Sequence, residues 1–452
     1  MSDVISAVST PFGRGGIAVI RISGDGAIET ADKIFRRPGG KKLSDARANS
    51  VSYGEIIRAG ARIDDGCATV FRAPRSYTGE DVVEISCHGG ILVTNEVFAA
   101  TLDAGARAAE AGEFTRRAFV NGRLSLTEAE AVIDLIDAET EEAARLAAGG
   151  AAGALGRETA AIREKLIALI SAAYVQIDYP DEDLSGLDAA GASDGIDEIL
   201  GDIDRLIATY RAGHAVIGGI DAVICGTPNT GKSSLLNLLL GKERAIVTPV
   251  AGTTRDTIEE RCSIGRVTLN LCDTAGIHES GDEVERLGID RTREKLKNCE
   301  LAIAVVDSSR PMSDEDLTLL ESLDPSKSVL VLNKCDLAPA ALPDLSRFTR
   351  TVRVSCVTGE GRDRLTSVIE EMFIDGDIDY SSATVTNARQ KAALDRARAF
   401  VASAAQAMSS GATADVAGLD LELAAAAVGE VDGRSVSEEV VDGIFSRFCI
   451  GK

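Results

Sequence analysis

The stretch that most constrains this 452-residue chain runs from Ile224 to Asn237 and reads I-C-G-T-P-N-T-G-K-S-S-L-L-N. Gly226, Gly231, Lys232 and Ser233 fit the pattern G-x-x-x-x-G-K-[ST], which is typical of a phosphate-binding loop. Glycines let the backbone curl so that successive N–H groups point at phosphate oxygens. The flanking runs 221–225 and 233–240 predict a strand before the loop and a helix after it, whose N-terminus favours negative charge.

Three later stretches follow in the order expected of a GTP-binding α/β domain. A strand-like run leads into Asp273-Thr-Ala-Gly276, a second leads into Asn333-Lys-Cys-Asp336, and 352–357 reads as a strand and a turn. Asp273 can hold a Mg²⁺-bound water, and the N–H of Gly276 can contact a γ-phosphate. Asp336 can accept two hydrogen bonds from guanine, and a site built in this way rejects adenine by ~10⁴-fold or more.

These motifs predict which residues contact the nucleotide and which contact Mg²⁺. Ser233 and Thr254 are expected on Mg²⁺, and Ile277 stands where Ras-like proteins carry the Gln that orients the attacking water. Either hydrolysis is slow, or the water is positioned from elsewhere. The residues expected to contact GTP are Asn229, Thr230, Gly231, Lys232, Ser233, Ser234, Thr248, Thr254, Asp273, Thr274, Ala275, Gly276, Asn333, Lys334, Asp336, Ser355, Cys356 and Val357.

The loop G-x-P-N-x-G-K-S-S, the run Gly252-Thr-Thr-Arg-Asp256 and the C-terminal Cys449-Ile-Gly-Lys452 are together very specific. With them the chain resembles the tRNA-modification GTPase family MnmE (TrmE) from end to end. In that family K⁺ replaces an arginine finger, between two G domains that meet face to face. The resemblance implies Glu285 as the acid that orients water, and it implies K⁺ ligands at Asn229, Thr248, Val250 and Thr253.

Residues 1–117 alternate strand-like and helix-like segments, which indicates an α+β domain. The resemblance implies that this domain forms a homodimer and holds 5-formyltetrahydrofolate, or a related folate, as one-carbon donor. The implied folate contacts are Arg21, Glu84, Arg123 and Lys452, and the family usually has Lys where this chain has Arg123. The resemblance also implies that Cys449 takes part in the tRNA chemistry. A thiolate needs nearby positive charge to be reactive at neutral pH, and Lys452 or Arg447 could supply it.

Helical patterns occupy 118–215 and 378–452 on either side of the GTPase domain, 216–377. Ser125-Leu-Thr-Glu128 reads as a capping box, and helices are expected over 159–177, near 196–212, over 388–408, over 419–428, and from 436 to the end. Neither half buries a full core alone, so the prediction is one all-α bundle with the mostly parallel α/β domain inserted in it.

Composition limits the remaining classes. The net charge of −23 excludes a surface that binds nucleic acid all over, so RNA contacts must be local; 35–42, 115–117 and 291–297 are basic candidates. No apolar run is long enough to span a membrane, and no basic start marks a signal peptide. Nine cysteines without a C-x-x-C pair make zinc binding improbable and indicate a reduced, cytoplasmic chain.

Two functions of different class fit these motifs. The first, which the resemblance implies, is a K⁺-stimulated GTPase that would act with the family's flavoprotein partner MnmG/GidA in a heterotetramer and add a (carboxy)methylaminomethyl group to C5 of the wobble uridine of certain tRNAs. The second is a switch GTPase of the ribosome-assembly type, which shares the G-x-P-N-x-G-K-S loop. Such proteins usually append a basic RNA-binding module, whereas 378–452 is helical and not notably basic, which favours the enzyme.

Overall fold

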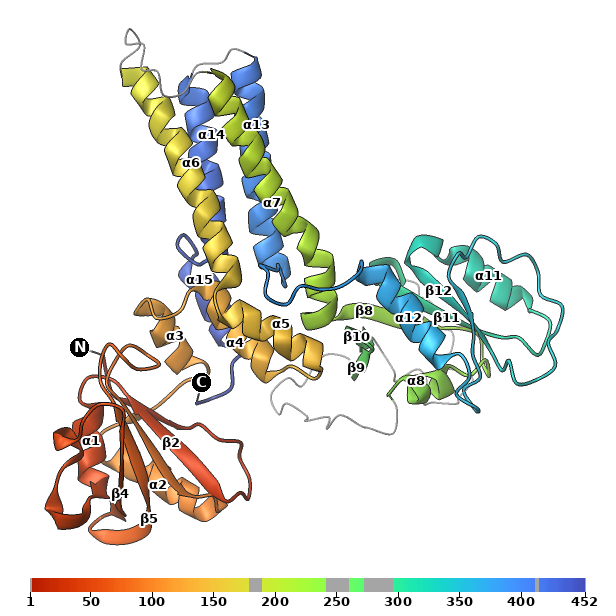
Figure 1. The fold of residues 1–452 in the computed structure, drawn as a ribbon. Helices are drawn as coiled ribbons and strands as arrows, with labels where there is room; N and C mark the ends of the chain where they lie inside the picture. Colours follow the sequence, from red (N-terminus) through yellow and green to blue (C-terminus); the bar gives the residue numbers. More distant parts are fainter. Residues whose placement is uncertain (1, 179–188, 241–259, 272–295, 411–413, 452) are drawn as a thin grey trace. The chain divides into compact units, whose positions relative to one another are not determined.

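The computed structural model describes residues 2–178, 189–240, 260–271, 296–410 and 414–451. The chain divides into two compact units. Figure 1 labels their helices and strands and colours them in chain order. The first unit contains 1–133, 151–163 and 425–452, and the second contains 134–150 and 164–424. The predicted three-domain boundaries, near 117, 215 and 377, remain a prediction.

The first unit is built on a seven-stranded sheet with the order β3-β4-β5-β6-β2-β1-β7. Its pairings are antiparallel except that β1 and β7 run parallel. The strands are β1 Ile5–Val8, β2 Ile17–Ser23, β3 Phe35–Arg36, β4 Ser50–Arg58, β5 Ala61–Phe71, β6 Val82–His88 and β7 Arg107–Ala108.

Alternation along the strands separates the two faces of this sheet. Val83, Ile85 and Cys87 of β6 are buried in a core shared with the helices α1 (Ala27–Ile34) and α2 (Ile91–Asp103). Glu84 of β6 and Arg21 of β2 are opposite each other in the register and belong to the other face. The sequence alternation therefore places two predicted site residues side by side.

Three short helices lie wholly or mostly in this unit: α3 (Glu113–Val120), α4 (Leu126–Ile136) and α15 (Glu438–Phe445). The capping box predicted at the start of α4 is confirmed, because Glu128 N donates to Ser125 Oγ at 3.2 Å and Ser125 N donates to Glu128 Oε2 at 2.6 Å. Leu126 and Ala129 pack with Phe445 and Phe448 in a small apolar core. Residues more than three hundred positions apart thus share one cluster.

The second unit contains a six-stranded sheet with the order β13-β12-β11-β8-β10-β9. Every pairing is parallel except β9 with β10. All seven residues of β11 are buried, as expected for a strand covered on both faces. The strands are β8 Ile220–Cys225, β9 Glu260–Ile264, β10 Val267–Leu271, β11 Leu301–Asp307, β12 Ser328–Asn333 and β13 Thr351–Arg353; the helices α8 Lys232–Leu240, α11 Asp314–Ser322 and α12 Arg362–Phe373 alternate with them.

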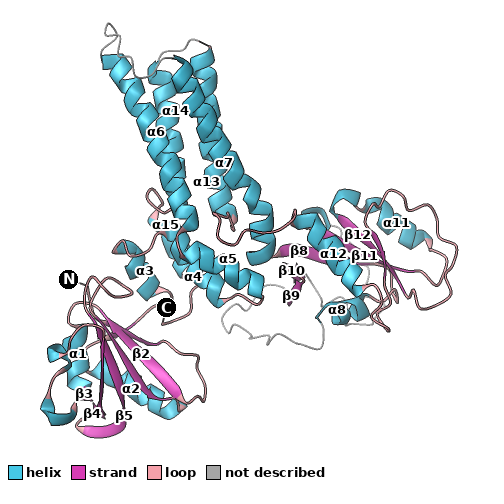
Figure 2. Cartoon of the chain, in the orientation of Figure 1, coloured by secondary structure: helices cyan, strands magenta, loops and turns pink. Residues whose placement is uncertain are grey.

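The remaining helices are α5 (Glu141–Ala151), α6 (Ala154–Asp178), α7 (Ala189–Ile217), α13 (Ala388–Ser409) and α14 (Ala414–Val431). Helices α7 and α13 run side by side with the parts of α6 and α14 that belong to the second unit (Figure 2). Ion pairs link neighbouring helices, with Lys165 Nζ 2.6 Å from Asp202 Oδ2 and Arg398 Nε 2.5 Å from Asp204 Oδ1. The predicted fold class, an α+β domain with a helical bundle and an inserted, mostly parallel α/β domain, is confirmed.

Helix α7 (Ala189–Ile217) is longer than the predicted 196–212, and α14 (Ala414–Val431) is longer than the predicted 419–428. Two further helix limits are also wrong. Helix α6 begins at Ala154 rather than at 159, because Gly156 continues the helix and its neighbours pack around it. The last helix ends at Phe445 instead of running to the terminus, because Ile450 bridges to Ala111 beside the N-terminal sheet. Both errors reflect tertiary contacts that override a local pattern.

Candidate nucleotide-binding site

The loop between β8 and α8 has the geometry required of a phosphate-binding loop. A Cβ on Gly226 would lie 2.4 Å from the carbonyl oxygen of Val305. Gly231 has a φ of 98°, and a Cβ there would lie 2.2 Å from Asn333 Nδ2. Asn229 is left-handed, with a φ of 64°, which Asn tolerates better than most residues. Side chains larger than hydrogen are therefore excluded at both glycines.

Lys232, the first residue of α8, lies over this loop. Its ammonium donates to the carbonyl oxygens of Gly226 and Thr227, each at 2.9 Å. Thr230 is fully buried and donates through Oγ1 to the same Thr227 carbonyl at 2.9 Å. The positive charge and the start of the helix thus meet at one point, as a phosphate site requires.

Asn333, at the end of β12, ties the phosphate loop to the predicted base-binding loop. Its Nδ2 donates to the carbonyl oxygen of Thr230 at 2.8 Å, and its Oδ1 accepts from Cys356 N at 3.3 Å. Asn333 is only 2% exposed. Both of these side-chain contacts are with backbone groups. Asn333 thus fixes the spacing between the phosphate-binding loop and the predicted base-binding loop, which must hold opposite ends of one nucleotide.

The other base-side residues differ in exposure. Lys334 is left-handed, with a φ of 62°, and its Nζ lies 2.6 Å from Asp307 Oδ2. Burial opposes ionisation of Asp307, but hydrogen bonds from Lys334 and Ser309 hold its pKa below the usual value. Asp336 is exposed, so its carboxylate is accessible to a base.

The loop 355–357, predicted to touch the base from its other side, follows β13. Ser355 is fully buried, and its Oγ accepts from Thr358 N at 3.2 Å. Val357 is 87% exposed. Burial raises the pKa of the Cys356 thiol, which keeps it neutral next to the loop. The structure thus brings residues from β8, β12 and β13 to one edge of the sheet.

Sequence reasoning missed a second support for the phosphate loop. Thr227 Oγ1 donates to Asp316 Oδ1 and accepts from Arg310 Nη2 at 3.2 Å. Asp316 is 2% exposed, and Arg310 Nη1 lies 3.1 Å from its Oδ2. Asp316 also closes a capping box with Ser313 at the start of α11. The spacing Ser313-x-x-Asp316 was the sequence signal, but nothing local connects it to Thr227.

Two predicted site residues, Ser233 and Ser234, lie at the start of α8. Ser233 is half-buried and Ser234 is exposed. Several other predicted site residues lie outside the described residues. The predicted residues that lie outside the described part of the chain are Thr248, Val250, Thr253, Thr254, Asp273, Thr274, Ala275, Gly276, Ile277, Glu285 and Lys452.

The first unit carries the predicted folate residues. Arg21 Nη2 lies 2.8 Å from Glu84 Oε1, and the guanidinium lies 5.2 Å from the centre of the Tyr77 ring. Arg21 Nη1 is buried without a hydrogen-bond partner in the described structure. Because an orphaned buried donor costs about 1–3 kcal/mol, this atom fits an oxygen acceptor from a ligand. Arg123 Nε donates to the carbonyl oxygen of Ser76 at 3.2 Å.

The C-terminal tail is seated against the first strand of the same unit. Ser9 Oγ donates to the carbonyl oxygen of Gly451 at 3.1 Å. Gly451 has a φ of 99°, and a Cβ there would lie 2.3 Å from the carbonyl oxygen of Val8. Ala7, the residue before Val8, pairs with Arg21 in the sheet. Cys449 is exposed, so the tail places this thiol on the same unit as Arg21 and Glu84.

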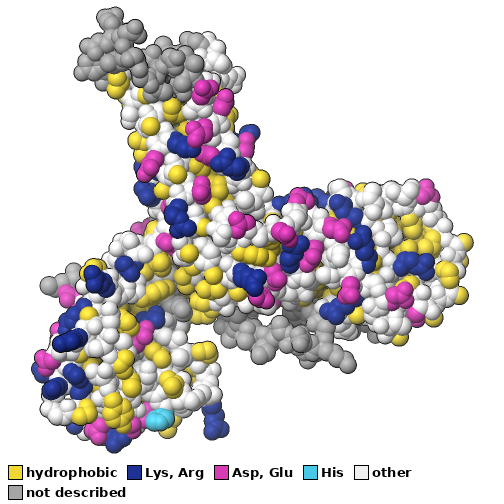
Figure 3. All heavy atoms as spheres, in the orientation of Figure 1, with side chains coloured by type: hydrophobic (Ala, Val, Ile, Leu, Met, Phe, Trp, Pro, Cys, Tyr) yellow, Lys and Arg dark blue, Asp and Glu magenta, His cyan; other side chains and the backbone are white. Residues whose placement is uncertain are grey.

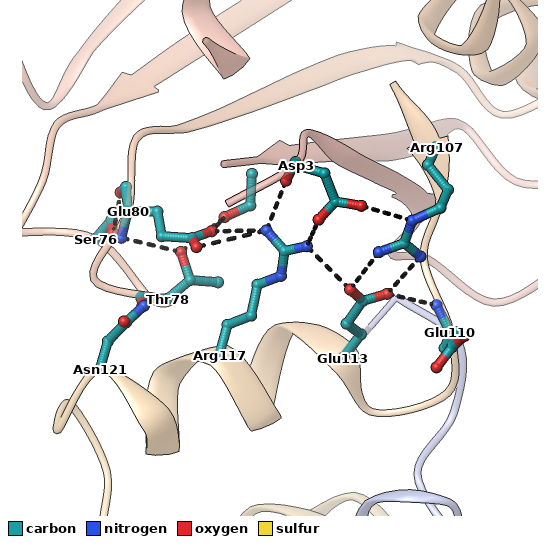
Figure 4. Close-up of polar contacts among 10 residues, drawn as sticks. Asp3, Ser76, Thr78, Glu80, Arg107, Glu110, Glu113, Arg117 and Asn121 are labelled. Carbon is teal, nitrogen blue, oxygen red and sulfur yellow. Dashed lines mark hydrogen bonds and ion pairs between the residues drawn. The ribbon is translucent and has the colours of Figure 1, made fainter. Parts of the chain in front are cut away.

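A network of charges fixes α3 to this sheet (Figure 4). Arg117 donates to Glu80, Glu113 and Asp3, with Nη2 2.6 Å from Asp3 Oδ1. Arg107 donates to the same Glu113 at 2.8 Å. Burial opposes ionisation of Glu113, but the hydrogen bond from Arg107 and further ones from Glu110 N and Arg117 lower its pKa. All four carboxylate contacts are between side chains of the unit itself, so this cluster is structural.

The second unit thus has the features that define a P-loop GTPase: a strand, a glycine-rich loop and a helix, with two further loops on the base side. This GTPase domain is part of a larger chain. Two family models match it: the MnmE helical domain over residues 126–449 and the GTP-binding protein TrmE N-terminus over residues 4–123. The chain belongs to the tRNA modification GTPase MnmE family, as its relatives show.

The tRNA modification GTPase MnmE of Carboxydothermus hydrogenoformans is 41% identical over 460 residues, which cover 100% of each chain. The protein of the same name from Symbiobacterium thermophilum is 43% identical over 456 residues, covering 100% of this chain and 99% of that one. Among solved structures, the G domain of the T. maritima FeoB iron transporter is 29% identical, covers 34% of this chain and 98% of its own, and has a TM-score of 0.25. Across the described helices, none has the length and apolar character to cross a membrane.

Proposed function

We propose that this chain hydrolyses GTP and that hydrolysis serves the modification of C5 of the wobble uridine of certain tRNAs. The main support is the phosphate-binding loop, to which Lys232 and Asn333 both donate hydrogen bonds. The chain is also related over its whole length to tRNA modification GTPases. The ribosome-assembly alternative lacks a comparable support, because the described residues after the GTPase domain form helices.

Guanine recognition rests on Asp336, an exposed carboxylate that follows the braced Asn333. In Asp336→Asn one acceptor becomes a donor, which complements the oxygen that xanthine carries in place of the exocyclic amine of guanine. We expect this variant to prefer xanthosine nucleotides over GTP, measured by competition for a fluorescent nucleotide. Asp344→Asn, an exposed change in the same domain, is the matched control and should retain the preference for GTP.

K⁺ would be held by Asn229, Thr248, Val250 and Thr253, and Mg²⁺ by Ser233 and Thr254, with Glu285 orienting the water. When bound, K⁺ supplies positive charge next to the bond that breaks. The left-handed Asn229 is exposed at the phosphate loop, which supports its use as a ligand.

The test compares GTP hydrolysis in K⁺ and in Na⁺. We expect stimulation by K⁺ that Asn229→Ala abolishes while the slow rate in Na⁺ is unchanged. Equal slow rates of the unmodified chain in both salts would remove the potassium mechanism, and the GTPase assignment itself would stand.

The folate donor would be held by Arg21, Glu84, Arg123 and Lys452, with Cys449 acting in the tRNA chemistry. The orphaned Arg21 Nη1 and the seat of the C-terminal tail near β1 support this placement. Calorimetry with 5-formyltetrahydrofolate should show binding that Arg21→Met weakens. Full tRNA-modifying activity of Cys449→Ser would rule the thiol out.

The proposed assembly is a homodimer through the N-terminal domain, which joins MnmG/GidA in a heterotetramer. Phe12, Ile17 and Leu92 support a dimer, because they are 72%, 67% and 74% exposed although apolar. Light scattering of the chain with and without MnmG/GidA measures both states. Nucleoside analysis of bulk tRNA from a deletion strain separates the two function classes: intact wobble uridine modification would favour the assembly factor.

A further inference from the structure

One edge of the N-terminal sheet carries an unusual concentration of positive charge. Residues 36–47 contain five basic residues and one acidic residue, in a chain whose net charge is −23. They begin at the last residue of β3, the edge strand of the sheet. Several Lys and Arg side chains lie on the outer side of this domain, around α1 (Figure 3). We call Arg36, Arg37, Lys41, Lys42, Arg47 and Arg72 the basic edge.

The basic edge is held in place by apolar anchors. Leu43 is fully buried and Ala46 nearly so, both in the core beneath the sheet. The lysines before Leu43 and Arg47 after Ala46 are exposed. Arg37 Nη1 donates to the carbonyl oxygen of Lys42 at 2.8 Å, so one cation helps fix the loop that presents the others. A loop of fixed shape loses little conformational freedom on binding.

The acidic groups near this loop do not neutralise it. Asp32 accepts hydrogen bonds from the backbone N–H groups of Leu43 and Ser44, and Asp45 accepts one from Lys42 N. Glu55, the register partner of Arg36, pairs with Arg62 at 3.4 Å. The carboxylates are therefore occupied by backbone or by another arginine.

Six other arginines of the same domain behave differently. Arg21, Arg58, Arg62, Arg107, Arg116 and Arg117 all lie within ion-pair distance of a carboxylate. In the described structure, no ion pair involves a member of the basic edge. Arg72 Nη2 instead donates to the carbonyl oxygen of Ser44 at 2.7 Å, which keeps that guanidinium beside the loop. Positive charge without internal carboxylates is the footprint of an anionic partner.

We infer that the basic edge binds the phosphate backbone of a structured RNA, and the proposed function, on which this inference rests, supplies tRNA. Residues 36–47 contain no aromatic side chain, and Phe35 is buried, so stacking on unpaired bases is absent from this edge. Contacts that depend on phosphate charge alone position an RNA without reading its sequence. The edge would thus hold the body of the tRNA, while the modified base is handled elsewhere.

The test measures binding of the full-length chain to fluorescently labelled total tRNA by anisotropy, between about 50 and 200 mM KCl. Each lost phosphate contact reduces the slope of log affinity against log salt by about one. We expect Lys41→Ala/Lys42→Ala to lower the slope by about two. Lys41→Arg/Lys42→Arg, which keeps both charges, should have the same slope as the unmodified chain. Lys327→Ala/Arg362→Ala, which removes two exposed cations of the GTPase domain that lie outside the basic candidate runs, should leave it unchanged.

Unchanged tRNA affinity and slope in Lys41→Ala/Lys42→Ala would overturn the inference, as would an unmodified chain that binds no tRNA. Retained tRNA binding with lost binding to phosphatidylglycerol vesicles would also overturn it, because the partner would then be an anionic membrane. GTP hydrolysis without tRNA separates this result from a failure of the proposed function: the variant should match the unmodified chain in GTPase rate and in melting temperature.

Discussion

The buried contact between Thr227 and Asp316 gives the sharpest prediction about the phosphate loop. Thr227 offers its hydroxyl to Asp316 and its carbonyl oxygen to Lys232. In Thr227→Val the shape is conserved and the hydroxyl is lost, so a carboxylate that is 2% exposed loses one of its donors. A hydrogen bond to a charged group contributes about 1.5–3 kcal/mol. We therefore expect the free energy of unfolding of the GTPase domain to fall by about 2 kcal/mol.

The same change should weaken nucleotide binding. Because the Thr227 peptide holds the Lys232 ammonium, we expect the Kd for GDP to rise about tenfold, which corresponds to about 1.4 kcal/mol. Urea titration measures the stability, and a fluorescent GDP analogue measures the affinity. Thr227→Ser keeps the hydroxyl and should change both quantities little. Wild-type stability and affinity in Thr227→Val would refute the reasoning.

Three further predictions use matched variants. Gly231→Ala should abolish nucleotide binding, because its Cβ would lie 2.2 Å from a side-chain amide, whereas Gly418→Ala in α14, with open space around it, should retain binding by the same fluorescence assay. Gly451→Ala should release the C-terminal tail, seen as faster hydrogen exchange of Ser9 and the tail amides, whereas Gly443→Ala in α15 should not. Glu113 has a pKa below its ordinary 4.5, so its stabilisation is full above pH 4.5 and is lost as the pH falls through the folded pKa. Glu113→Gln should therefore cost about 2 kcal/mol at pH 7 and less at acidic pH, measured by urea titration.

Local chemistry made the nucleotide site predictable. The strand before the loop begins at Ile220 against a predicted 221, and the helix after it begins at Lys232 against a predicted 233. Glycine is required at position 226 by the close Val305 backbone, and at position 231 by a positive φ and the close Asn333 side chain; a sequence shows such a constraint directly, as glycine. The capping box at Ser125 was predictable for the same reason, because both of its partners lie within one helical turn.

Contacts between distant segments could not be predicted in this way. The role of Asp316 depends on Thr227, 89 positions earlier in the chain. The true start of α6 depends on packing around Gly156. In both cases the local sequence is ordinary. The structural role depends on which distant segments come into contact, and a local pattern does not show this. A periodic pattern predicts that a face is buried, but it does not name the surface that covers it.

The most distant contacts join the two ends of the chain, and they have a consequence for folding. The small core of the first unit needs Leu126 and Ala129 from one end, and Phe445 and Phe448 from the other. Gly112 can only be glycine there, since a Cβ would lie 2.5 Å from the Phe445 carbonyl oxygen. These contacts close a loop of more than three hundred residues, whose entropic cost grows only slowly with length. The strands of this sheet all lie within 5–108, so the sheet can form without the C-terminal segment, whereas the seat of Cys449 requires residues 445–451. Any chemistry that uses the tail therefore depends on contacts between these two distant segments.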